Sequence, residues 1–320
     1  MSLISLLIAL AAEKYLYSPF WQFKTYYQQY LALLQRFNCL EKSWLSILGV
    51  SMLILAPVLA VYLLLMLIDD SVLHLVFSTV ILIVCFGSVA TRDTYKSYLM
   101  AAFRGELTTC KLHHSQLLQD KNLPEMGFGQ TLIWLNYRYY VAIMLFFIIF
   151  GAPGVVFYRL VITLNEKQDN DATSAANSNS SNDSKDSVSA SSTIDVNEAD
   201  DETENISAVN DLPTKMTTEA CQALQQLLFW LDWLPVRLTT FGYMMVGHFS
   251  KALPVWLESF FEFEKPAAQI LGDVAKKSED MMVDEQDCTA EPCLLVRLAK
   301  RNLLLLLAVI AVLTLSGVIS

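Results

Sequence analysis

Four stretches of the chain contain no charged residue and are each long enough to cross a lipid bilayer as a helix. A hydrocarbon core about 30 Å thick takes about 20 helical residues, and the backbone inside it must satisfy its own hydrogen bonds. The sequence therefore predicts an all-α integral membrane protein, a polytopic helical bundle with extra re-entrant or amphipathic helices. The four predicted transmembrane helices lie at about residues 44–68, 71–91, 139–160 and 302–320.

The net charge of −10 comes from one polar segment. Residues 165–220 carry 13 Asp and Glu against 3 Lys, whereas the rest of the chain has 19 acidic and 19 basic residues. The segment holds too few large apolar side chains to offset the entropy lost on ordering. We therefore expect an N-terminal membrane region at 1–164, a disordered acidic loop at 165–218 and a C-terminal region at 219–320.

Basic residues near the predicted spans favour a cytoplasmic N-terminal region and a cytoplasmic loop at 92–138. The pair Asp69-Asp70 then forms a tight external hairpin. The apolar run Leu3–Ala12 is too short to cross, and we expect an uncleaved helix packed against the bundle or lying in the interface. The basic residues used are Lys24, Arg36, Lys42, Arg92, Lys96, Arg104 and Lys111.

The topology of the second half depends on residues 221–250. If the third span leaves the cytoplasm, the acidic loop is periplasmic, yet Arg297, Lys300 and Arg301 favour a cytoplasmic start for the last span. Both hold only if residues 221–250 cross the membrane as well. Charged residues in their middle would cost about 2.5–3.5 kcal/mol each on insertion scales. A crossing, a re-entrant segment and a helix on the membrane surface all remain open.

Three polar groups beside the apolar runs are candidates for a ligand site. An ionisable residue at membrane depth is a functional hypothesis, although Trp, Tyr and Arg also anchor helices at membrane surfaces. Pro153 predicts a kink in the third span, and Pro235 predicts a break across which an acid and a base could pair. The ligand-binding candidates are Asn136, Arg138, Tyr158, Arg159, Asp232, Trp233, Arg237 and His248.

Other chemistry is weakly supported. The sequence has no Walker A loop, HExxH, G-x-S-x-G or basic nucleic-acid patch, so no catalytic residue and no nucleic-acid partner are predicted. The six cysteines are scattered, and only Cys288 and Cys293 are close together. This spacing without a second ligand pair is a weak zinc signal, so no metal site is predicted. Free thiols are favoured, with a small disulfide loop as the alternative in a periplasmic location.

Several motifs together resemble the AmpE family. They are W-L-N-Y-R-Y-Y at 134–140, G-A-P-G-V-V-F-Y-R at 151–159, L-D-W-L-P-V-R-L at 231–238 and G-H-x-x-K-A-L-P-x-W at 247–256. The short N-terminal run ending in Glu13 and the last membrane helix fit as well. This family is related to the CobD/CbiB group of ATP-dependent membrane enzymes, which join an aminopropanol group to a corrinoid acid. The resemblance covers most of the chain outside residues 165–215.

Two departures from the enzyme group matter for function. The chain has I-T-L-N-E at 162–166 where the enzymes have N-T-L-D, and W-L-N-Y-R replaces an acidic element before the third span. Both changes remove carboxylates that would hold Mg²⁺ with a nucleotide. Arg159, Asp232 and Arg237 remain at matching positions. The resemblance thus implies a relative that keeps the scaffold and an anionic-ligand pocket.

The resemblance implies a multi-pass protein of a bacterial inner membrane. The first expectation is a non-enzymatic regulator in β-lactamase induction and cell-wall (muropeptide) recycling, with no cofactor and with components of that pathway and the lipid bilayer as partners. The alternative is an ATP-dependent membrane ligase of the CobD/CbiB type that acts on a corrinoid or related acid with ATP and Mg²⁺.

Overall fold

A long apolar segment at residues 128–168 forms the centre of the fold. The computed structural model describes residues 2–317 except 14, 16–20, 37–46, 87–88, 122, 181–216, 263–264 and 280–288, and all regular elements in this part are helices. The central segment comprises α7 (Phe128–Asn136), the π-helical turn η3 (Tyr137–Val141) and the first part of α8 (Ala142–Ser180). In the most apolar part of this segment, 56% of the residues are buried. The corresponding share is 17% in α3 (Ile47–Met66) and 22% in α13 (Ala290–Leu315). By length and composition, these three segments can cross a membrane.

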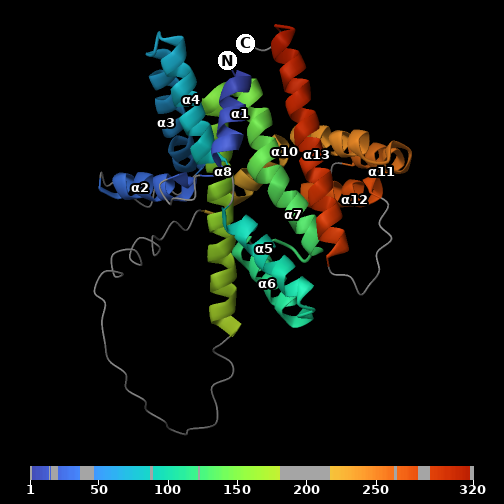
Figure 1. The fold of residues 1–320 in the computed structure, drawn as a ribbon. Helices are drawn as coiled ribbons and strands as arrows, with labels where there is room; N and C mark the ends of the chain where they lie inside the picture. The colour runs from blue at the N-terminus through green and yellow to red at the C-terminus, as the bar shows by residue number, and fades with distance from the viewer. Residues whose placement is uncertain are drawn as a thin grey trace, which may run out of the picture.

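Helix α8 reverses direction at Gly151. This residue has φ 70° and ψ −162°, a backbone conformation that only glycine adopts readily. The Tyr139 hydroxyl donates to the Glu166 carboxylate at 2.6 Å, although 27 residues of straight helix would separate them by about 40 Å. The rings of Phe146 and Tyr158 also stack, with centroids 4.5 Å apart. Residues 128–150 and 152–168 are therefore two antiparallel arms, which we call the central hairpin (Figure 1).

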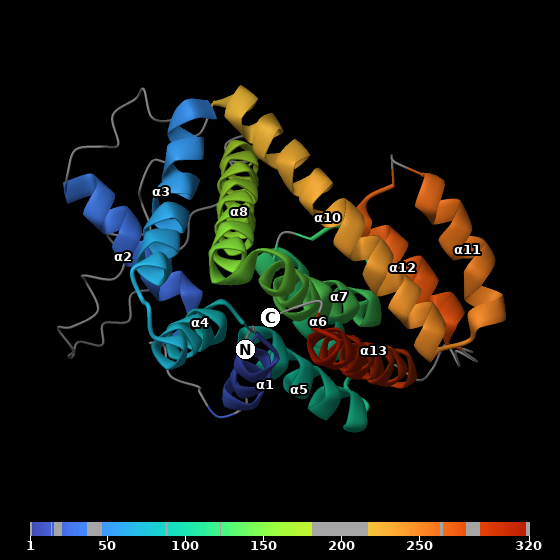
Figure 2. The same ribbon diagram turned by 90° about the horizontal axis from the view of Figure 1, so that it is seen from above.

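Two groups of helices pack around the central hairpin (Figures 1 and 2). The first group comprises α1 (Ser2–Glu13), α3 and α4 (Ser71–Cys85), with the short helix α2 (Phe23–Arg36) beside the start of α3. Leu6 and Ala9 of α1 have no exposed surface, so the N-terminal apolar run packs against the bundle. The second group contains α13 and three helices that follow the acidic segment. The pair α5 (Val89–Phe103) and α6 (Leu107–Lys121) lies at the end of the bundle where α7 begins.

The three helices after the acidic segment lie across the bundle. They are α10 (Thr218–Val246), α11 (Phe249–Phe261) and α12 (Ala267–Ser278), and Figure 2 shows α10 at nearly its full length. Helix α10 continues through Pro235, and it is not among the segments apolar enough to cross a membrane. Gly242 of α10 packs closely against Asn302 of α13, whose side-chain amide donates to the Thr239 carbonyl at 3.5 Å. Residues 221–246 therefore belong to one helix that crosses the bundle sideways, and residues 249 and 250 begin the next helix, α11.

The predicted spans agree with the structure in part. Residues 44–68 overlap α3, and 302–320 overlap α13, which begins at Ala290. The run at 71–91 is not one helix, because α4 ends at Cys85 after 15 residues and α5 begins at Val89. Fifteen residues extend only about 22 Å. Residues 139–160 belong to a candidate span as expected, but the kink predicted at Pro153 is a full reversal two residues earlier.

The first part of the predicted acidic loop is helical. Helix α8 continues to Ser180, so residues 165–180 are helical. Residues 181–216 lie outside the described part of the chain, and the predicted disorder there stays a prediction.

The reversal at Gly151 makes a testable prediction about topology. A hairpin that enters and leaves the membrane on one side returns residue 168 to the side of residue 128. We therefore expect reporter fusions after residues 120 and 190 to give the same cytoplasmic signal, with a fusion after residue 70 giving the opposite one. This result would reverse the periplasmic assignment of the acidic loop and remove the need for a crossing at 221–250. A periplasmic signal at residue 190 would show that the two arms do not both traverse the membrane.

Candidate functional site: a buried polar cluster at the central hairpin

Asp232 of α10 is the centre of a buried polar cluster. Its side chain is only 3% exposed, and one carboxylate oxygen, Oδ1, accepts two hydrogen bonds. The donors are the hydroxyls of Tyr137 at 2.8 Å and Tyr158 at 2.7 Å. Tyr137 lies on the first arm of the central hairpin and Tyr158 on the second, so one carboxylate joins both arms to the helix that crosses them.

Arg138 supplies the positive charge near this carboxylate. It is 7% exposed, is attracted electrostatically to Asp232, and lies over the Trp134 ring with its guanidinium carbon 5.0 Å from the ring centroid. The backbone at this point is a π-helical turn, which contains one more residue per turn than an α-helix. In this turn the three consecutive residues 137, 138 and 139 are all buried. We call Tyr137, Arg138, Tyr158 and Asp232 the inner cluster.

A second cluster connects the central hairpin to α6. The ammonium group of Lys121, the last residue of α6, donates to the Tyr139 hydroxyl at 2.7 Å. That hydroxyl donates in turn to Glu166 Oε1 at 2.6 Å. The guanidinium of Arg159 lies 4.4 Å from the centroid of the Tyr139 ring. We call Lys121, Tyr139, Arg159 and Glu166 the outer cluster.

Arg159 has unused hydrogen-bonding capacity. Its Nε and Nη1 atoms are buried and have no hydrogen-bond partner among the described residues. A guanidinium presents five donors and retains its charge under all ordinary conditions. Because buried polar groups are normally paired, these two nitrogens mark a place where an anionic group or a water molecule would fit.

Arg237 binds backbone rather than Asp232. Its guanidinium donates to the carbonyls of Ser259 at 3.3 Å, Phe260 at 3.4 Å and Glu262 at 3.0 Å, at the end of α11. It also donates to the Trp233 carbonyl at 3.1 Å and lies over the Trp233 ring. A cation that binds the last carbonyls of a helix satisfies groups without partners inside that helix. The predicted break at Pro235 and the predicted pairing of Asp232 with Arg237 are therefore wrong.

The eight predicted candidates occupy different places. Arg138, Tyr158 and Asp232 meet in the inner cluster, and Arg159 belongs to the outer one. Trp233 and Arg237 fasten α10 to α11, and the exposed His248 precedes α11, where its backbone N–H donates to the Ser278 carbonyl at 2.7 Å. Asn136 instead lines a cavity on another face of α7.

The sequence interpretation missed Tyr137, Tyr139 and Lys121, and it treated Glu166 only as a departure from the enzyme pattern. Tyr137 and Tyr139 belong to the first motif, W-L-N-Y-R-Y-Y at 134–140. Aromatic residues at a membrane boundary are as typical of interfacial anchors as of a ligand site, so the motif did not identify these two tyrosines as site residues. Lys121 and Glu166 are 45 residues apart. Only the reversal at Gly151 brings them to the same hydroxyl, and no local pattern indicates that contact.

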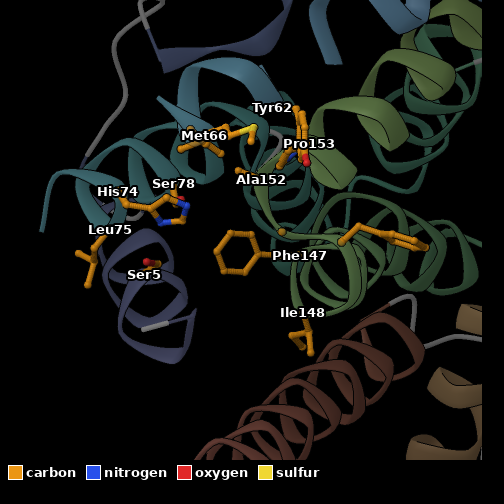
Figure 3. Close-up of a pocket in the computed structure, with 13 residues that line it drawn as sticks. Ser5, Tyr62, Met66, His74, Leu75, Ser78, Phe147, Ile148, Ala152 and Pro153 are labelled. Atoms are coloured by element: carbon orange, nitrogen blue, oxygen red, sulfur yellow. The ribbon is translucent and has the colours of Figure 1, made fainter. Parts of the chain in front are cut away.

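A separate cavity of about 440 Å³ lies at the turn of the central hairpin (Figure 3). Its wall contains Gly151 and Pro153 from the turn and Ser5 from α1. Figure 3 shows His74 and Ser78 of α4 on the side opposite Phe147. None of the eight predicted residues lines this cavity. It lies at the other end of the bundle from the outer cluster, because the arms lead from Gly151 towards Tyr139 and Glu166.

In the part of the chain that the structure describes, no group of three or more His, Cys, Asp or Glu side chains is placed to hold a metal ion. The Asp232 oxygen that faces the inner cluster already accepts hydrogen bonds from two tyrosines.

Comparison with known proteins gives one consistent relationship. The family described as "Regulatory signalling modulator protein AmpE" matches residues 1–188 and 208–320. A curated relative, "Protein AmpE" of Shigella flexneri, is 26% identical over 247 residues, which cover 73% of this chain and 72% of the relative. No solved structure matches the chain.

Proposed function

Because the chain belongs to the AmpE family, we propose that it is a non-catalytic regulatory protein of the bacterial inner membrane that acts in β-lactamase induction and muropeptide recycling. The family description, a regulatory signalling modulator, supports the general role. The structural observation that supports it best is the double hydrogen bond to Asp232. It makes one buried carboxylate the link between three helical segments.

The two clusters provide a path for a signal from α10 to the end of the bundle that carries α5 and α6. The inner cluster joins α10 to both arms of the central hairpin, and the outer cluster joins the hairpin to Lys121 of α6. Buried polar networks favour discrete arrangements, because a partly satisfied network is costly. A ligand that changes the position of α10 would thereby change the position of α6, and the α5–α6 pair would present this change to a partner.

Deleting the gene should alter β-lactamase induction and the muropeptide pools, and the inner cluster should be needed to restore both. We expect wild-type protein to complement the deletion and the double variant Tyr137→Phe/Tyr158→Phe to complement it poorly, because it removes both donors to Asp232. β-Lactamase activity after inducer addition and chromatography of muropeptides are the measurements. Unchanged induction and unchanged pools in the deletion strain would rule out this function.

Tyr243→Phe is the matched control for the double variant. Tyr243 is also fully buried on α10, but its hydroxyl has no hydrogen-bond partner among the described residues. This variant should complement as well as wild type. Equal loss in the variant and the control would mean that the assay reports general damage to a buried tyrosine.

A second candidate function is an ATP-dependent ligase of the CobD/CbiB type, acting on a corrinoid or related acid. The buried nitrogens of Arg159 without partners favour an anionic ligand near Lys121. Substrate-dependent ATP turnover by the purified protein, abolished by Arg159→Ala, would support the ligase and displace the regulatory proposal. Absence of nucleotide binding at millimolar ATP would exclude it.

A further inference from the structure

A cavity of about 690 Å³ lies between α1, α5, α7, η3 and α13. Tyr139 of the outer cluster is in its lining, and none of the four residues of the inner cluster is. Figure 2 shows α1, α5 and α13 on the same side of α7. Figure 1 shows that α1 starts and α13 ends at the same end of the bundle, so these two helices run antiparallel. They form the two walls of a groove whose floor is α7.

The charged residues of this groove gather at one end. Arg92 and Lys96 of α5 and Lys300 of α13 line it, against one carboxylate, Glu13 at the end of α1. Glu13 already interacts with Arg92 at 3.4 Å and accepts a hydrogen bond from the Tyr140 hydroxyl at 2.7 Å. The residues that line the groove therefore carry three positive charges and one negative charge. Lys96 also forms an ion pair with Asp93 at 3.5 Å outside the lining, but this pair is exposed to solvent, where such pairs are weak. The Lys300 side chain is exposed as well.

The phenol of Tyr95 adds no negative charge to the lining of the groove. Burial and the adjacent Cys293 thiol raise the pKa of Tyr95 to about 12, so this residue stays neutral at physiological pH. Tyr95 lines the same cavity beside Lys96.

The other end of the groove is apolar on both walls. Helix α1 presents Leu10 and Leu7 about one and two turns before Glu13. Helix α13 presents Leu303 and Leu307 about one and two turns after Lys300. Because the two helices are antiparallel, both walls change from charged to apolar in the same direction. At 1.5 Å per residue, the apolar part extends for about 10 Å along the bundle.

Asn136 adds an unsatisfied acceptor near the charged end. It lines the cavity, and its buried Oδ1 atom has no hydrogen-bond partner among the described residues. It lies one helical turn from Tyr140, which contacts Glu13. A buried acceptor without a partner calls for a ligand or water that donates a hydrogen bond.

We propose that this groove is a binding site for an anionic glycerophospholipid with a hydroxylated headgroup. The phosphate lies among Arg92, Lys96 and Lys300, and a headgroup hydroxyl donates to Asn136. An acyl chain follows the leucines of α1 and α13 towards the other side of the membrane. The site then lies at the end of the bundle that basic residues assign to the cytoplasm, where anionic lipid headgroups attract Lys and Arg.

Lipid retention by the purified full-length protein tests this site. We expect native mass spectrometry after incubation with equal amounts of phosphatidylglycerol and phosphatidylcholine to show preferential retention of phosphatidylglycerol. Lys96→Gln/Lys300→Gln should reduce its affinity about 30-fold at low salt, from about five- to sixfold for each cation at a membrane surface. Ala11→Trp should block the groove, and because Ala11 is exposed the fold can accommodate the larger side chain.

Lys111→Gln/Lys277→Gln is the matched control, because both lysines are exposed and neither lines the cavity. It removes the same charge and should retain phosphatidylglycerol like wild type. Equal retention of the two lipids, or equal loss in the two double variants, would overturn the site. Competition by millimolar inorganic phosphate would show that the cations bind a free anion and would overturn the lipid assignment. Loss on Ala11→Trp at unchanged thermal stability would support the acyl-chain position.

Discussion

Replacing Asp232 with alanine is expected to lower the free energy of unfolding by about 3–5 kcal/mol, the usual effect of removing one partner from a buried charge pair. The substitution leaves the hydroxyls of Tyr137 and Tyr158 without their acceptor. It also leaves the buried guanidinium of Arg138 without the carboxylate that attracts it. Thermal unfolding of the purified protein in detergent measures the change, and poor recovery from the membrane fraction would accompany it.

Two further variants separate charge from hydrogen bonding. Asp232→Asn retains an acceptor oxygen but loses the charge, so it should be less harmful than alanine. Tyr158→Phe removes one donor and should cost about 1.5–3 kcal/mol, as expected for a hydrogen bond to a charged group. If Asp232→Ala unfolds at the wild-type temperature, the inner cluster does not hold α10 to the central hairpin.

The long uncharged runs predict the class of fold well, because the absence of charge over about 20 residues follows directly from solvation by lipid. Runs such as 44–68 must be helical once they enter the bilayer, and α3 overlaps that run. The same argument fails for 71–91, where the uncharged run continues past the end of α4 at Cys85. Hydropathy measures the cost of exposing a residue to lipid, and it contains no term for where a helix ends.

The sequence predicted several residues of the candidate site, but it did not predict which residues they contact. Arg138, Tyr158 and Asp232 stand out because polar groups within apolar sequence are costly unless paired. Their partners follow from a backbone reversal and from the sideways path of α10, neither of which is a local property. The pairing expected between Asp232 and Arg237 relied on a break at Pro235, but α10 continues through this residue. Its neighbour α11 supplies the carbonyls that Arg237 binds.

Gly151→Ala is expected to destabilise the central hairpin and to disturb its topology, because every contact between the two arms depends on the reversal at this residue. A side chain added at Gly151 would meet only Pro153 Cδ at 3.7 Å, an ordinary contact. The cost is therefore conformational: φ 70° with ψ −162° lies in a region essentially restricted to glycine, where other residues lose about 1–3 kcal/mol. Straightening α8 would relieve this strain but would separate Tyr139 from Glu166 and Tyr137 from Tyr158.

Two measurements test this outcome, the unfolding temperature in detergent and the membrane side of a reporter after residue 190. Gly151→Ala should lower the first and make the second heterogeneous, and Gly151→Val should do so more strongly. Gly105→Ala is the matched control, because Gly105 also has a positive φ of 75° but lies in the α5–α6 turn, where an added Cβ would meet no atom within 4 Å. It should leave the reporter signal unchanged. Pro153→Ala should have a smaller effect than Gly151→Ala, because a residue already inside the returning arm does not set the reversal. The opposite ranking would assign the turn to the proline, and the central hairpin would then depend on a lost backbone hydrogen bond rather than on the backbone freedom of glycine.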